Sequence, residues 1–193
     1  MLSRRTFIKS ALAANAALLT NPSQALQLVL DNAKGQPLLI LADEKSPAAK
    51  QFIAQVSDDN ASLGLDIGVQ FERVKQFCSE SPNGLISGLT RDSDFFVIEQ
   101  VAKDYGFYPS YSANHIQQGN SLSHEVTASQ QSADLIAHGL AQAGEQWPVW
   151  LANNTQLLPQ GHQPMIASKS QIQSTHAAQD FLVSWSLSAA KNT

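Results

Sequence analysis

The chain has 193 residues, a formal net charge of −4 and a single cysteine, Cys78. This length is enough for one domain with a sizeable hydrophobic core. The acidic balance argues against nucleic acid as a partner, because an acidic surface repels phosphate groups. One cysteine excludes an internal disulfide, and its place on an apolar helical face predicts a buried, inert thiol.

The first 25 residues have the pattern of an export signal. Arg4, Arg5 and Lys9 form a basic start, an apolar run follows from Ala11 to Leu19, and the small residues around Ala25 fit a cleavage site after it. The apolar run is too short for a bilayer, which takes about 17–25 residues to cross. No later run reaches that length, so we expect no stable membrane span.

The stretch SRRTFIK, residues 3–9, resembles the twin-arginine motif of Tat signal peptides, whose pattern is S/T-R-R-x-F-L-K. Ile8 stands where leucine is commoner. The resemblance implies periplasmic localisation, the Tat export machinery as a partner and a chain that folds before export. A bound cofactor or a passenger partner subunit would each explain such a route, but neither is identified. Signal recognition would rest on Arg4, Arg5, Phe7 and Lys9.

Residues 26–193 form the predicted mature part, a single α/β domain. The signal holds three of the twelve Lys and Arg residues and none of the sixteen Asp and Glu residues. The mature part therefore has nine basic and sixteen acidic residues, a net charge of −7.

Strands and helices alternate in the first half of this domain. Apolar runs on both sides of residues 32–35 predict a hairpin, and its second strand, Pro37 to Ala42, has the pattern of a strand buried on both faces. Ser46 and Pro47 predict a helix start, and apolar spacing continues that helix to Val56. We then expect a strand over residues 63–71, a short helix over 72–80, a buried strand over 85–89 and a helix over 93–106.

The second half is less regular. Residues 107–112 favour an extended segment, residues 121–128 are ambiguous, and the spacing of apolar residues predicts a helix over 129–144. The run WPVWLANN, residues 147–154, favours a last strand, and residues 155–173 a long surface connection. Residues 174–193 fit both a strand and a helix, and propensity favours the helix.

This order predicts a three-layer α/β sandwich with a mostly parallel sheet, Rossmann-like or flavodoxin-like, and an antiparallel N-terminal edge strand. In such sheets ligands bind beyond the carboxyl ends of the strands. We therefore expect the ligand site on one rim, formed by the residues at those ends: Asp43, Glu44, Ser87, Gly88, Thr90, Arg91, Asp92, Asn153 and Asn154.

The loop SGLTRDSD, residues 87–94, is the most informative part of this rim. Gly88 would allow close backbone approach, and Arg91 could bind the carboxylate or phosphate of a small anionic ligand. Helix capping is the commoner explanation for Thr90 and Asp92, and Arg91 could instead pair with Asp92 or Asp94. The loop contains no nucleotide-binding fingerprint.

Two functions follow as hypotheses. The first is an accessory or small-ligand-binding protein of the periplasm that uses the rim around Gly88 and Arg91. The second is a periplasmic hydrolase or redox enzyme whose site combines Asp43, Asp92 and His115. The five histidines show no metal-ligand spacing, so no metal site is expected, and no cofactor is identified.

Overall fold

The computed structural model describes residues 36–56, 61–63, 67–161 and 163–189, and the signal and the first hairpin strand lie outside these residues. The strands are β1 (Leu38–Ala42), β2 (Ala61–Leu63), β3 (Leu85–Thr90), β4 (Phe107–Ser129) and β5 (Met165–Ala189). The helices are α3 (Pro47–Ile53), α4 (Ile67–Glu80), α5 (Asp92–Lys103), α6 (Ala133–Ala143) and α7 (Trp147–Asn154), with short 3₁₀ turns η1 (Gly144–Gln146) and η2 (Thr155–Leu157).

The five described strands form one mixed sheet in the order β2-β1-β3-β5-β4. β1 runs parallel to both β2 and β3, whereas β5 runs antiparallel to both β3 and β4. The prediction of a mostly parallel, Rossmann-like or flavodoxin-like sheet is therefore wrong.

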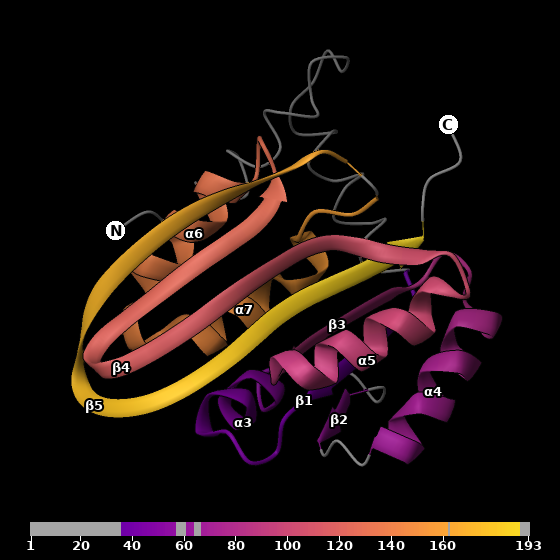
Figure 1. Ribbon diagram of the computed structural model, residues 1–193, viewed down its shortest axis with the longest axis horizontal. Coiled ribbons are helices and arrows are strands. Elements are labelled where there is room, and N and C mark those ends of the chain that lie inside the picture. The colour runs from indigo at the N-terminus through magenta and orange to yellow at the C-terminus, as the bar shows by residue number, and fades with distance from the viewer. Residues whose placement is uncertain (1–35, 57–60, 64–66, 162, 190–193) are drawn as a thin grey trace.

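β4 and β5 form a long antiparallel ribbon that doubles back on itself (Figure 1). The pairing shifts register between Gly119 and Ser121, where Gly119 has a φ of +58°, a conformation that glycine adopts without strain. On each side of this bend the buried residues of β4 alternate with less buried ones, as a strand with one covered face requires. Residues 121–128, ambiguous in the sequence, are the second limb of this strand.

Helices cover both faces of the sheet. α4 and α5 lie on one face, where Val74, Ile98 and Trp185 belong to one hydrophobic cluster. α3, α6 and α7 lie on the other face, where Phe52, Leu140 and other apolar side chains form a second cluster. The ribbon bend and α3 lie at the same end of the molecule (Figure 1).

Four predicted elements are wrong in whole or in part. Residues 147–154 form helix α7, which Pro148 suits because proline fits the first turn of a helix. Residues 67–71 begin helix α4, and residues 165–189, expected as a connection followed by a helix, form the single strand β5. The predicted strand over 85–89 and the helices after Ser46, after Ser93 and over 129–144 are found, with shifted ends.

No helix within the described ranges is long and apolar enough to cross a membrane.

Candidate functional site

The carboxyl ends of β1 and β3 meet at the same edge, as expected for a parallel pair. The Asp43 amide donates a hydrogen bond to the Leu89 carbonyl at 3.0 Å. Arg91 Nε then donates to Asp43 Oδ2 at 3.0 Å, and its Nη1 donates to Asp180 Oδ1 at 2.8 Å and to the Phe181 carbonyl at 2.9 Å. We call Asp43, Arg91 and Asp180 the Arg91 cluster. It ties β5 to the ends of β1 and β3.

Neither partner of Arg91 was expected from the sequence. Asp92, proposed as one, is exposed in the first turn of α5. Asp94, the other, forms no ion pair with Arg91; desolvation and the nearby charge of Asp43 raise its pKa, while the Arg91 backbone and charge lower it. The guanidinium that we expected to meet a ligand carboxylate thus meets two carboxylates of its own chain.

Ser87, Gly88 and Thr90 contact Trp185 of β5. The Ser87 hydroxyl donates to the Trp185 carbonyl at 2.8 Å, and the indole Nε1 donates to Thr90 Oγ1 at 2.9 Å. A Cβ at Gly88 would lie 2.5 Å from the indole ring, so only glycine leaves room for the ring here. The close approach predicted at Gly88 is real, but a tryptophan of the same chain makes it.

The remaining rim residues do not join these groups. Glu44 is exposed in the turn after β1. Asn153 and Asn154 lie at the end of α7, and their amides donate to the carbonyls of Val149 and Trp150 one turn earlier, at 2.7 and 2.6 Å. They stabilise the end of a helix and do not follow a strand, which is where the prediction placed them.

A groove of about 630 Å³ opens between α3, the start of α7 and the ribbon bend. This volume lies within the range typical of small-molecule sites, about 300–1,000 Å³. Its charged side chains are Lys45, Arg91, Glu145 and Asp180. The other lining residues are Pro47, Ala48, Gln51, Gln117, Leu122, Gln146, Trp147, Pro148, Ser174, His176, Ala178 and Gln179.

A second polar cluster also lines the groove. Glu145 Oε1 accepts hydrogen bonds from the Thr175 amide and hydroxyl, both at 2.6 Å, and from the Ser174 hydroxyl at 2.9 Å. These bonds lower the pKa of Glu145 to about 2, mainly through the Thr175 side chain. We call Glu145, Ser174 and Thr175 the Glu145 cluster; it fixes the bend of β5 to η1.

Behind the groove lies a buried polar chain that the sequence did not reveal. His115 Nδ1 and His124 Nδ1 are 2.7 Å apart, His115 Nε2 lies 2.7 Å from the Ser184 hydroxyl, and Ser184 lies 2.7 Å from the Tyr111 hydroxyl. Trp147, which lines the groove, stacks on His115 with centroids 4.0 Å apart. The period-two alternation of residues 111–115 and 122–128 was the available signal, because it places both histidines on the covered face.

Burial controls the protonation of this pair. Desolvation lowers the pKa of His115 well below its usual value, and the charge of His124 lowers it further. Desolvation also lowers the pKa of His124 to about 4. His124 Nε2 is buried and has no hydrogen-bond partner among the described residues. Both imidazoles are therefore neutral at pH 7, and His115, 2% exposed, is closed off from the groove by Trp147.

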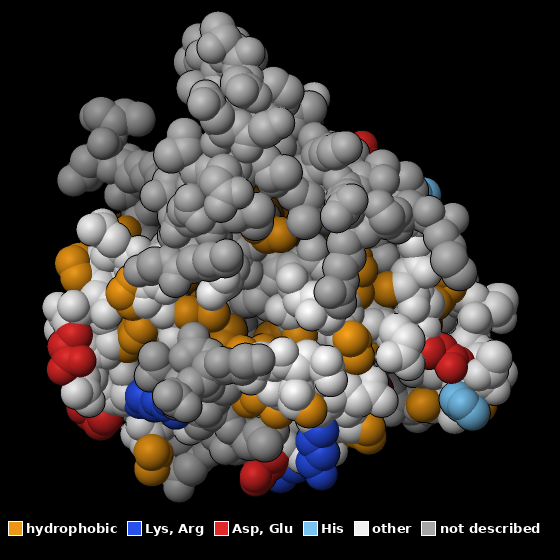
Figure 2. Space-filling view, turned by 180° about the vertical axis from the view of Figure 1, so that it is seen from behind, with side chains coloured by type: hydrophobic (Ala, Val, Ile, Leu, Met, Phe, Trp, Pro, Cys, Tyr) orange, Lys and Arg blue, Asp and Glu red, His pale blue; other side chains and the backbone are white. Residues whose placement is uncertain are grey.

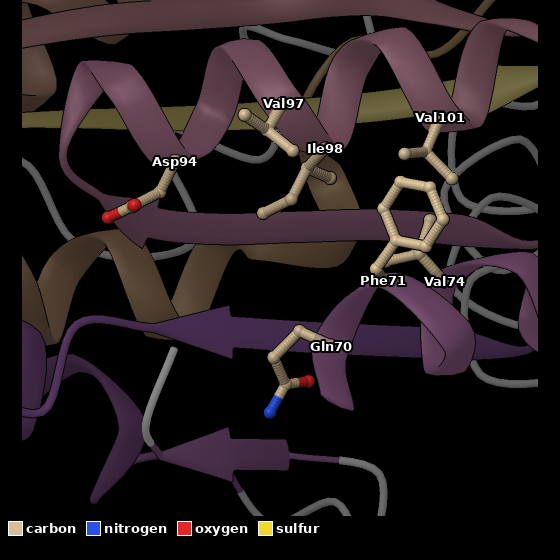
Figure 3. A pocket seen from close by; sticks show the side chains of 7 residues that line it. All are labelled: Gln70, Phe71, Val74, Asp94, Val97, Ile98 and Val101. Atoms are coloured by element: carbon tan, nitrogen blue, oxygen red, sulfur yellow. The ribbon is translucent and has the colours of Figure 1, made fainter. Parts of the chain in front are cut away.

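A second cavity lies between α4 and α5 (Figure 3). Phe71, Val74 and Val101 line one end of it, and Gln70 and Asp94 lie toward the other. Its volume, about 10 Å³, is at most enough for one water molecule. It is a packing gap and not a ligand site.

The other chemical groups add little reactivity. Cys78 is 3% exposed, and burial raises the pKa of its thiol to about 11, which fits the inert thiol that we expected. Among the described residues, no group of three or more His, Cys, Asp or Glu side chains could hold a metal ion. On the face shown in Figure 2, visible Lys and Arg side chains lie in small separate groups near acidic ones.

No protein-family model, curated protein or solved structure matches the chain. The geometry of the groove is therefore the basis for a functional assignment.

Proposed function

We propose that the protein is an exported, non-catalytic binding module and that its ligand lies in the groove between α3, α7 and the ribbon bend. The groove is the observation that carries this proposal. Its volume suits a small molecule, and the Arg91 and Glu145 clusters fix residues of its lining, so that little ordering would be needed on binding. Of the predicted rim residues, Arg91 alone lines this groove.

The enzymatic hypothesis combines Asp43, Asp92 and His115. Asp43 is bound to Arg91, Asp92 is exposed on α5, and His115 is bound to His124 and Ser184 behind Trp147. A general base must reach its substrate within hydrogen-bond distance, directly or through one water. These positions favour the binding module, in which none of the three has to touch a reacting atom.

The groove can be tested by filling it. Ala178 is exposed, lines the groove and pairs with Gly119 in the ribbon, so Ala178→Trp would occupy the groove without entering the core. Ala167, exposed on the same strand outside the groove, gives the matched control Ala167→Trp. We expect a metabolite screen by thermal shift to find ligands that stabilise the wild type and Ala167→Trp but not Ala178→Trp. Ligands that stabilise all three proteins equally would show that the groove is not the site.

Export is tested separately with the full chain. If residues 3–9 act as a twin-arginine signal, changing both Arg4 and Arg5 to lysine should leave the protein in the cytoplasm, while Lys50→Arg in α3 should not. Cell fractionation measures the outcome. Equal periplasmic amounts of the three proteins would remove the twin-arginine route.

A further inference from the structure

Three of the four charged side chains that line the groove, Arg91, Asp180 and Glu145, are bound by groups of the chain itself, whereas Lys45 forms no ion pair among the described residues. Arg91 lies between Asp43 at 3.0 Å and Asp180 at 2.8 Å, and Glu145 Oε1 accepts three hydrogen bonds. The lining holds two cationic residues and two carboxylates, so it has no net charge with histidine neutral. An anionic ligand would have to compete with two carboxylates for Arg91, and a cationic ligand would meet Lys45 and Arg91.

Most of the polar groups left for a ligand are amides, beside the exposed side chains of Lys45 and His176. Gln51, Gln146 and Gln179 are exposed, line the groove and make no side-chain hydrogen bond within the described part of the chain. The amide nitrogen of Gln117 donates to Ser174 Oγ at 3.2 Å and to the His176 carbonyl at 2.7 Å, which leaves its oxygen as an acceptor. Each free amide offers both donors and acceptors on one planar group.

Hydroxyl groups match this arrangement, because a hydroxyl donates one hydrogen bond and accepts others. The same groove also exposes apolar surface from Pro47, Ala48 and Ala178, against which the C–H groups of a sugar ring can pack. From these observations, and resting on the proposed function, we infer that the groove binds a neutral, hydroxyl-rich ligand, a saccharide, and not the small anion that the rim suggested.

The probes are maltotriose and diacetylchitobiose as neutral saccharides, citrate and inorganic phosphate as anions, and spermidine as a cation, each titrated calorimetrically. We expect a saccharide to bind the wild type with an affinity that does not change between low and high salt. Changing both Gln146 and Gln179 to alanine removes the hydrogen bonds of two amides and should weaken binding by about tenfold or more. Gln118→Ala, at an exposed glutamine of the bend that does not line the groove, should leave binding unchanged.

The outcomes distinguish two claims, that the ligand is a saccharide and that the ligand binds in the groove. Binding of citrate, phosphate or spermidine that is lost in Ala178→Trp and weakens as salt rises would overturn the saccharide and leave the groove as the site. Saccharide binding that survives Ala178→Trp would overturn both. A wild type that binds none of the five probes would overturn the saccharide assignment. The broader metabolite screen would then decide whether the groove is a ligand site.

Discussion

Lowering the pH from 7 to 5 should reduce the free energy of unfolding by about 2 kcal/mol through His124 alone, since its pKa falls from 6.5 to about 4 on folding. A histidine whose pKa is depressed by folding takes up a proton in the unfolded chain before it does so in the folded one. The stability is therefore present above pH 6.5 and is lost as the pH falls toward 4. His115, whose pKa is also lowered, adds to the loss in the same direction.

Denaturant unfolding at a series of pH values measures this effect. Changing both His115 and His124 to leucine should flatten the dependence between pH 7 and 5, because two buried titrating groups are replaced by apolar ones. His138, exposed on α6, provides the control His138→Gln, which should keep the wild-type dependence. An unchanged slope in the double variant would show that the pair is not the source of acid sensitivity.

Gly88→Ala should destabilise the protein by about 2–3 kcal/mol, since the added methyl group would meet the Trp185 ring at 2.5 Å and the Leu41 carbonyl oxygen at 2.8 Å. Gly88 does not have a positive φ, so the cost is a clash and not a backbone preference. At a site without such a clash, the same change commonly stabilises by about 0.4–1 kcal/mol. The sign of the effect is therefore informative.

A double-mutant cycle tests the cause. Trp185→Phe alone loses the hydrogen bond to Thr90 and part of the stack on Phe95, whose ring centroid lies 5.2 Å from that of Trp185. In the double variant the smaller ring should leave space for the methyl group. The double variant should therefore lose less free energy of unfolding than the two single variants lose together. Denaturant unfolding measures these losses. Strictly additive losses would show that the clash with the Trp185 ring is not the cause.

Local signals predicted several elements of the first half because these elements are short and their boundaries are marked by neighbouring residues. Ser46 and Pro47 start α3 as expected, and the Ser46 hydroxyl accepts from the Ala49 amide at 3.4 Å. Gly106, predicted to end the helix before it, has a φ of +80°. These features depend on neighbouring residues, which a sequence shows directly.

The second half could not be predicted in this way because long-range pairing decides it. Phe181, Val183, Trp185 and Leu187 have strand periodicity, yet the same segment also fits a helix. What selects the strand is the pairing of β5 with β3 on one side and β4 on the other. Once β5 occupies this place, the sheet is no longer mostly parallel.

The same cause limited the prediction of the site. Asp43 and Arg91 were placed on a common rim, and they do meet. Asp180 binds Arg91 and Trp185 binds Thr90, and both come from the strand that was not predicted. His115 was selected as a candidate, but its partners His124 and Ser184 become its neighbours only through the folded ribbon.

The position of β5 in the sheet has a consequence for biosynthesis. Until residues 183–188 leave the ribosome, the β1–β3 unit and β4 have no strand between them, and Gly88 must wait for a partner 97 positions later, Trp185. Such distant pairing slows folding and leaves β4 temporarily open to other chains. The sheet can therefore close only after residues 183–188 have been synthesised.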